Sequence, residues 1–220
     1  MLNLLDSSEQ YYQRACSLAS GSHYNSTNCV FASLSGLGEV YRQKKLFRKS
    51  IEMYNAALEC ANRLRKRDVV GEYDCYEGMS RAYCALTLFD SALVYCDLAR
   101  DVLSADSTTY QSWLVLNLIL KGDIYNEKQD FSQSIDAYQR ALSIRKDEYG
   151  IADKYVAELY HKLAVVSKGD QDFVTALNYL VAAKKAYSSL ASKADTSRAS
   201  YVLARKKLRN EIKECRKIIH

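Results

Sequence analysis

The sequence predicts an all-α protein, built as a solenoid of antiparallel helix pairs. Proline, which breaks helix interiors, is absent from all 220 residues, whereas strong helix formers are abundant. A hydrophobic content of 48% and 18 tyrosines indicate an ordered chain with a buried core. The third observation is a pattern of aromatic and small residues that recurs every 42 residues. A recurring pattern of this kind is typical of structural units that stack on one another.

The repeat is clearest in the stretch EKQDFSQSIDAYQRAL, residues 127 to 142. Steps of 42 residues keep an aromatic, a small residue and an alanine in register, at Phe47, Phe89, Phe131 and Phe173; Ser50, Ala92, Ser134 and Ala176; and Ala57, Ala99, Ala141 and Ala183. An upstream segment carries small residues at the same step, at Gly38, Ser80, Gly122 and Ala164. Each unit therefore contains two segments with helical apolar spacing, separated by a short polar turn such as residues 128–130.

The elements follow in order from this register. Residues 1–20 correspond to the second helix of a repeat whose first helix is absent, because Tyr12 stands one step before Tyr54. Four full repeats are expected at residues 28–69, 70–111, 112–153 and 154–195. Residues 196–219 keep one apolar stripe without the small crossing residue, which predicts a capping helix. We expect the chain to be a fragment of a longer solenoid; the alternative is that residues 1–20 are a natural half-repeat cap.

Local signals support the helix-turn-helix units. Asp130 and Gln133 are spaced as a capping box, and Asp172 stands at the equivalent start one repeat later. A glycine inside a helix costs about 1 kcal/mol relative to alanine. Gly122 therefore needs a packing reason, and we expect it to face Ala141 where the paired helices cross.

These residues resemble the tetratricopeptide repeat (TPR), with small residues at the helix crossing, paired aromatics and the closing Ala141-Leu142. The resemblance covers about residues 28 to 190 and implies a right-handed superhelical solenoid. The usual period of that family is about 34 residues, and the closing proline is missing here. Longer repeats of this kind are similar to those of kinesin light chains, and the stretch ALSIRKDEYG, residues 141 to 150, resembles their helix endings.

The resemblance also implies a partner. TPR proteins bind segments of other proteins on a concave face formed by the first helix of each pair. The residues that lie on this face, off the packing stripe, are Ser35, Glu39 and Arg42; Asp74, Glu77 and Arg81; Leu116, Ile119, Asp123, Asn126 and Glu127; and Glu158, His161, Lys162 and Val165. Acidic residues outnumber basic ones, which predicts a peptide or helix with basic and apolar side chains.

The third repeat supplies the apolar part of this prediction. Residues 113–120, WLVLNLIL, are apolar nearly all round, and such a helix should be covered by the core or by a partner. Our hypothesis is that Leu116 and Ile119 form an apolar anchor, flanked by Glu77, Asp123 and Glu158. The alternative places Leu116 and Ile119 in a homodimer contact, so that the chain is a structural, self-assembling segment of a larger protein.

Catalytic chemistry finds no support in the sequence. The histidines are isolated, and the Glu158-x-x-His161 motif occurs once, whereas helical metal sites need further carboxylates. We therefore interpret Glu158 and His161 as a solvent-facing pair, and expect no enzyme activity, small-molecule substrate, cofactor or metal. The positions where chaperone-binding TPR proteins carry a basic clamp hold Ser35, Glu39, Gly78, Leu116 and Leu120, so a clamp for an acidic tail is not expected.

Charge and cysteines bound the remaining possibilities. The segment from Arg198 to the C-terminus has eight basic and two acidic residues, so the net charge of +5 is concentrated in the last helix. Its cluster Arg205-Lys206-Lys207-Leu208-Arg209 could serve nuclear import, an acidic partner or nucleic acid, but a solvated helix face is the preferred interpretation. Seven scattered cysteines without a Cys-x-x-Cys motif favour free thiols in a reducing compartment, and no apolar run is long enough to span a membrane. We expect a cytoplasmic protein that does not bind nucleic acid.

Overall fold

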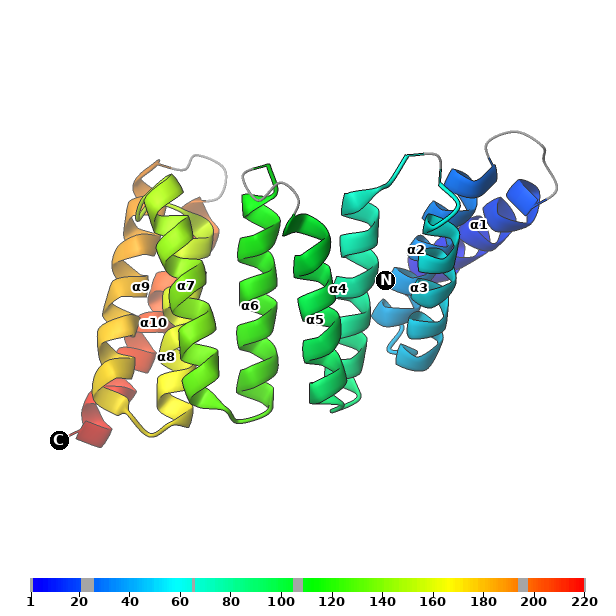
Figure 1. Cartoon of the computed structure of the whole chain (residues 1–220). Coiled ribbons are helices and arrows are strands. Elements are labelled where there is room, and N and C mark those ends of the chain that lie inside the picture. The colour runs from blue at the N-terminus through cyan, green and yellow to red at the C-terminus, as the bar shows by residue number, and fades with distance from the viewer. Residues whose placement is uncertain (1, 21–25, 65, 105–108, 194–197, 220) are drawn as a thin grey trace. The chain divides into compact units, whose positions relative to one another are not determined.

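The computed structural model describes residues 2–20, 26–64, 66–104, 109–193 and 198–219 (Figure 1). Within these ranges the chain forms ten helices and no strand, which confirms the all-α prediction. The helices are α1 (Leu2–Ser20), α2 (Ser26–Gln43), α3 (Phe47–Ala61), α4 (Val69–Ala85), α5 (Phe89–Leu103), α6 (Gln111–Glu127), α7 (Phe131–Tyr149), α8 (Lys154–Gly169), α9 (Phe173–Lys193) and α10 (Arg198–Ile219).

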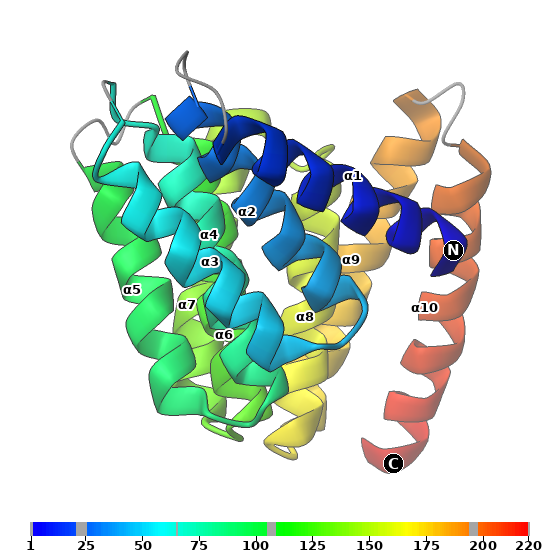
Figure 2. The same ribbon diagram turned by 90° about the vertical axis from the view of Figure 1, so that its right-hand side faces the viewer.

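The chain divides into two compact units, Met1–Asn117 and Leu118–His220, called here the N-terminal unit and the C-terminal unit. In the N-terminal unit each helix from α1 to α5 packs on the next, and α2 also packs on α4. In the C-terminal unit α7, α8, α9 and α10 pack in the same consecutive way, and Figure 2 shows α9 and α10 side by side. Consecutive helix pairing is therefore confirmed. The predicted repeat boundaries stay a prediction, and the last of them, between residues 195 and 196, lies outside the described residues.

The turns inside the helix pairs share one backbone conformation. Left-handed residues with positive φ occur once in each, at Lys45 (61°), Thr87 (60°), Gln129 (63°) and Gln171 (61°). The amide of the following residue donates to the carbonyl five residues upstream, at 2.8 Å for Leu46 to Tyr41 and 2.9 Å for Asp130 to Tyr125. This bond satisfies a carbonyl at the helix end, and the chain reverses within the three residues between the helices. It explains why the pairs are tightly antiparallel.

Aspartates begin several of the helices. The side chain of Asp130 accepts a hydrogen bond from the amide of Gln133 at 3.2 Å, and Asp172 accepts from Thr175 at 3.0 Å, so both predicted caps are confirmed. Asp68 and Asp153 cap α4 and α8 in the same way, and these two caps were not predicted. All four bonds satisfy amides that have no partner inside the helix.

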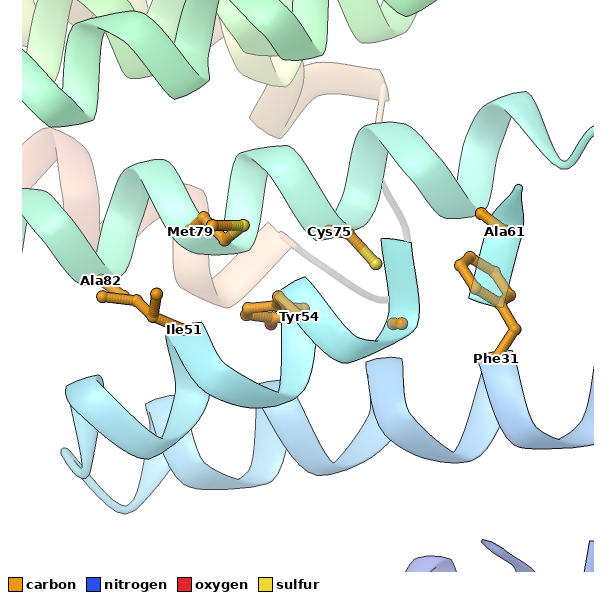
Figure 3. Close-up of a cluster of buried hydrophobic side chains, with 8 residues drawn as sticks. Phe31, Ile51, Tyr54, Ala61, Cys75, Met79 and Ala82 are labelled. Carbon is orange, nitrogen blue, oxygen red and sulfur yellow. The ribbon is translucent and has the colours of Figure 1, made fainter. Parts of the chain in front are cut away.

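The core of the N-terminal unit lies between its helix layers (Figure 3). Cys75 of α4 points toward α3, Ile51 of α3 lies beside Ala82 of α4, and Phe31 of α2 lies beside Ala61; Tyr54 and Met79 belong to the same buried cluster. In the C-terminal unit the apolar stripe of α10, formed by Leu208, Ile212 and Cys215, packs on Ala164, Leu180 and Ala183. The last helix therefore covers the end of the helix stack, and the capping-helix prediction is confirmed.

One packing expectation is wrong. A Cβ added to Gly122 would meet the ring of Tyr138, with Cε1 at 2.5 Å, and all three of its nearest neighbours are atoms of that ring. Ala141 is fully buried but does not supply the close contact. The reason is size, because a tyrosine ring is long enough to reach across the crossing and takes the nearest place to the facing glycine.

Candidate functional site

The N-terminal unit contains a groove of about 730 Å³, called here the N-terminal groove. Helices α1, α2 and α4 line it, with Tyr54 of α3 also contributing. Its predicted members are Ser35, Glu39, Arg42, Asp74, Glu77 and Arg81. All lie on α2 and α4 at spacings of three, four or seven residues, so they share one face of each helix.

Tyrosine rings and glycines shape the groove. The ring of Tyr12 lies against Gly36 on α2, and the ring of Tyr54 lies against Gly78 on α4, one step of 42 residues later. A side chain on either glycine would collide with the ring. The glycines therefore let the two tyrosine rings pack directly against α2 and α4.

Ion pairs within single helices neutralise much of the groove. Arg42 donates to both carboxylate oxygens of Glu39 at 2.7 and 2.8 Å, and Tyr54 donates to the same carboxylate at 3.1 Å. On α4, Arg81 pairs with Glu77. Burial tends to raise the pKa of Glu39, but the hydrogen bonds from Arg42, Gln43 and Tyr54 outweigh it, and the pKa lies below its usual value. Glu39 is therefore ionised and already has partners.

Asp74 differs from the other groove carboxylates. No hydrogen bond or ion pair to it occurs within the described part of the chain. Loss of water around it, together with the negative charges of Glu77, Asp68 and Glu39, raises its pKa to about 6. Its side chain is still partly exposed to solvent. A cation placed beside Asp74 would relieve this repulsion, and the groove leaves that position open.

The apolar wall of the groove comes largely from α1. Leu4, Leu5 and Tyr12 line the groove together with Val40 of α2. Lys44 holds α1 in place by reaching Asp6 and Glu9, each at 2.5 Å. This wall was not predicted, because residues 1–20 were interpreted only as a packing helix. The equivalence of Tyr12 and Tyr54 in the repeat register is the signal that could have found it.

In the C-terminal unit two of the predicted binding residues, Asp123 and Lys162, pair with each other. Asp123 accepts a hydrogen bond from Tyr138 at 2.5 Å, as Glu39 does from Tyr54. Lys162 also reaches Asp123, at 2.5 Å, and its ammonium lies 5.6 Å from the centre of the Tyr138 ring. Burial and the Asp123 charge raise the pKa of Tyr138. Lys162 corresponds in register to Gly78, so the N-terminal unit has no built-in ammonium at this place.

The residues of α8 are likewise paired. His161 lies 3.2 Å from Glu211 of α10, and Lys168 reaches the same carboxylate at 3.3 Å. Glu158 pairs with Lys154 at 3.6 Å. Glu158 and His161 therefore have separate partners rather than forming the expected solvent-facing pair. The reason is that α10 packs beside α8 and brings Glu211 to the imidazole.

The remaining predicted residues lie on α6. The side chain of Leu116 is 36% exposed, Ile119 and Asn126 are half-buried, and Glu127 is exposed. The hypothesis that Glu77, Asp123 and Glu158 flank Leu116 and Ile119 involves both compact units and stays a prediction. Asn117 of the same helix is buried, and its amide donates to the carbonyl of Cys96 at 2.7 Å. The apolar run of residues 113–120 is thus interrupted by a side chain with a structural partner.

Other chemistry has little material to work with. Within the described ranges, no three His, Cys, Asp or Glu side chains come together in a way that could hold a metal ion. None of the seven cysteines forms a disulfide bond; Cys75, Cys96 and Cys215 are buried and Cys29 is exposed. None of the described helices is long and apolar enough to cross a membrane.

Comparison with known proteins places the repeat and the fold. Residues 117–148 match the family model described as tetratricopeptide repeat. No curated protein sequence gives a significant match to the chain. Among solved structures, the crystal structure of BtubC (BKLC) from P. vanneervenii is 17% identical with a TM-score of 0.69, and the match covers 98% of this chain and 92% of that one.

A second similar structure contains repeats of the kind expected from the sequence. The crystal structure of the Podospora anserina putative kinesin light chain with nearly identical TPR-like repeats is 11% identical with a TM-score of 0.60. The match covers 85% of this chain and 93% of that chain. At these identities the likeness establishes the fold and leaves the ligand open.

Proposed function

We propose that this chain, which carries a tetratricopeptide repeat within a TPR-like helical fold, is a noncatalytic interaction module that holds a peptide or helix of a partner protein. The observation that carries the proposal is the N-terminal groove, which combines a carboxylate without a partner, Asp74, with the apolar wall of α1. Such a combination of apolar surface with a few polar groups is typical of binding sites.

The groove chemistry selects the kind of partner. A lysine or arginine of the bound segment would lie beside Asp74 and Glu77, where no lysine of this chain lines the groove. The pairing of Lys162 with Asp123 shows what such a contact looks like within this fold. Apolar side chains of the segment would pack on Leu4, Leu5 and Val40. The partner is therefore a segment in which basic and apolar side chains occur together.

The predicted residues of α6 and α8 are further candidates. Leu116 offers an apolar contact and Glu127 a polar one, because both are exposed; Ile119, Asp123, Asn126, Glu158, His161 and Lys162 are secondary candidates because they are half-buried or paired. We also propose that the protein works in the cytoplasm as an adaptor, because seven cysteines without a disulfide bond suit a reducing compartment.

The test is a binding measurement with designed peptides. Fluorescent peptides of alternating Lys and Leu, and matched peptides of alternating Glu and Leu, are titrated with the full chain and followed by anisotropy. We expect the basic peptide to bind and the acidic one not to bind. Asp74→Lys with Glu77→Lys should weaken binding by roughly tenfold or more, because it replaces two attractive charges by repulsive ones. The control is Glu52→Lys, which reverses the charge of one exposed carboxylate of α3 outside the groove.

Circular dichroism on the same samples separates loss of binding from loss of folding, because a folded variant keeps its helical signal. Equal affinity of the groove variant and the Glu52→Lys control would contradict the proposal. So would binding of the acidic peptide in preference to the basic one.

Self-association is a second candidate, and one observation favours it. Leu4, Tyr11 and Leu18 are each about 70% exposed and are spaced by seven residues, so they form one apolar stripe on α1. A stripe of this kind suits a second copy of the chain. Light scattering separates the candidates: a monomer favours the module, whereas a dimer that is lost on Tyr11→Lys or on Ile119→Asp favours assembly.

A further inference from the structure

Helix α10 carries a row of exposed cations with no counterpart among the other described helices of the C-terminal unit. Lys206, Arg209, Lys213, Arg216 and Lys217 are all exposed and follow spacings of three and four residues, so they lie on one side of the helix. We call this row the basic stripe. Within the described part of the chain none of the five has an ion pair or hydrogen bond.

The way α10 packs creates this stripe. The buried side of the helix carries Leu208, Ile212 and Cys215, which contact α8 and α9. Glu211 is one of only two acidic residues in the sequence of α10. Its carboxylate faces α8, where it lies beside His161 and Lys168. Because that acidic charge points inward while the cations point outward, the exposed face keeps a strong positive charge. Only Glu214 opposes it.

Elsewhere in the C-terminal unit, cations next to the helix interfaces have acidic partners. Arg145 pairs with Asp153 at 3.2 Å and Lys162 pairs with Asp123 at 2.5 Å. The cations of the basic stripe, by contrast, have no acidic partner within the described part of the chain. Neighbouring like charges repel one another, and this repulsion lowers the stability of the fold when no opposite charge lies near them. An anionic partner along α10 would turn this cost into attraction.

We propose that the exposed face of α10 docks an acidic helix of a partner protein, aligned along the basic stripe. Two helices laid side by side share a rise of about 1.5 Å per residue, so carboxylates at spacings of three and four residues match the stripe in step. Apolar side chains flank the cations, with Val202 49% and Leu203 68% exposed at one end and Ile218 58% exposed at the other. They give the partner helix apolar contacts beside its charges.

These flanking residues favour a protein helix over other polyanions. A nucleic-acid backbone offers phosphates along its length but no apolar surface to meet Leu203 and Ile218. A membrane surface would require a continuous apolar face on the helix, and here cations separate Val202 from Ile218. The surface lies on α10 and is distinct from the N-terminal groove.

The experiment uses the full chain and a labelled Ala-rich helical peptide of about 20 residues with glutamates at spacings of three and four, so that they form one stripe. A shuffled peptide of the same composition scatters its glutamates around the helix. Anisotropy at low salt should show the striped peptide binding at least several-fold more tightly than the shuffled one. Added salt of about 0.1 M should weaken binding, because it screens exposed charges over about 10 Å.

The variant Lys206→Gln, Arg209→Gln, Lys213→Gln should lose roughly tenfold in affinity for the striped peptide. Its matched control is Arg48→Gln, Lys146→Gln, Lys185→Gln, which removes the same charge from three exposed cations outside α10. Circular dichroism checks that both stay helical. Equal losses in the two variants, or equal binding of both peptides, would overturn the proposal. Tighter binding of single-stranded DNA or of phosphatidylserine vesicles would also overturn it, by assigning the stripe to another class of polyanion.

Discussion

Ser134 donates a hydrogen bond of 2.8 Å to the backbone carbonyl of Gly122, which ties the second helix of a pair to the first. The same two register positions are used by Ser50 and Gly38 at 2.7 Å. In the repeat between them the roles are exchanged, since Ser80 on the first helix donates to the carbonyl of Ala92 on the second at 2.7 Å. The crossing of each pair is thus fixed by one buried hydroxyl, except at Ala164 and Ala176, where neither residue carries one.

Ser134→Ala should lower the free energy of unfolding by about 1 kcal/mol, the usual net contribution of one hydrogen bond. The carbonyl of Gly122 keeps its helical partner, so no buried group is left without one. Urea unfolding measures the change. Ser132→Ala, an exposed position on the same helix, is the control and should change stability by less than about 0.5 kcal/mol. Equal losses of stability at both positions would show that the Ser134 hydroxyl does not stabilise the helix crossing.

Gly122→Ala should destabilise the C-terminal unit by about 1–3 kcal/mol, because the new methyl meets the buried ring of Tyr138. In the fourth repeat, Ala164 stands at the position of Gly122 and is larger than glycine, while Leu180 stands at the position of Tyr138 and is smaller than tyrosine. The double variant Gly122→Ala, Tyr138→Leu should therefore cost less than the sum of the two single changes. Additive losses would show that the ring and the glycine do not interact.

Thr87→Gly should raise the melting temperature. Thr87 holds a left-handed conformation with φ of 60°, which a β-branched residue adopts only at a cost of about 1 kcal/mol or more and which glycine adopts freely. Gln129→Gly at the equivalent turn should give a smaller gain, because an unbranched side chain tolerates this conformation better. The opposite control is Ser91→Gly inside α5, which should lower the melting temperature. A loss of stability in Thr87→Gly would contradict the turn geometry.

Asp74→Asn should stabilise the protein at neutral pH and not in acid. The raised pKa means that the folded chain holds the proton more tightly than the unfolded one, so stability falls as the pH rises from about 4 to about 6. The asparagine removes this loss. Urea unfolding at pH 7 and below pH 4 should show a gain over the wild type only at pH 7. Glu52→Gln, outside the groove, should show no such difference, and a gain of equal size at both pH values would contradict the prediction.

The repeat made most of the fold predictable. Helix pairs, polar turns, the caps at Asp130 and Asp172 and the packing stripe of α10 all follow from register and local patterns. The left-handed turn residues could not be foreseen, because Lys45, Thr87, Gln129 and Gln171 are not the glycine that usually marks this conformation. The partner of Gly122 was also missed, since register shows which positions are equivalent but not which ones touch.

The candidate site was less predictable, because partners across helices are invisible in a one-dimensional pattern. The sequence placed Glu39, Arg42, Glu77 and Arg81 on one face, and the N-terminal groove is lined by all four. The sequence could not show that Lys162 pairs with Asp123. Nor could it show that Glu211, fifty residues further along the chain, lies beside His161. Nor could it show that α1 forms the apolar wall.

Site-specific photo-crosslinking can show whether the N-terminal groove holds the partner segment. A benzophenone amino acid is placed at Gln43, which is exposed and lines the groove, or at Glu52, which is exposed outside it. After irradiation with the Lys-Leu peptide, mass spectrometry should find a peptide adduct at position 43 that unlabelled peptide competes away, and none at position 52. Adducts of equal yield at both positions, or an adduct at position 52 alone, would contradict the account.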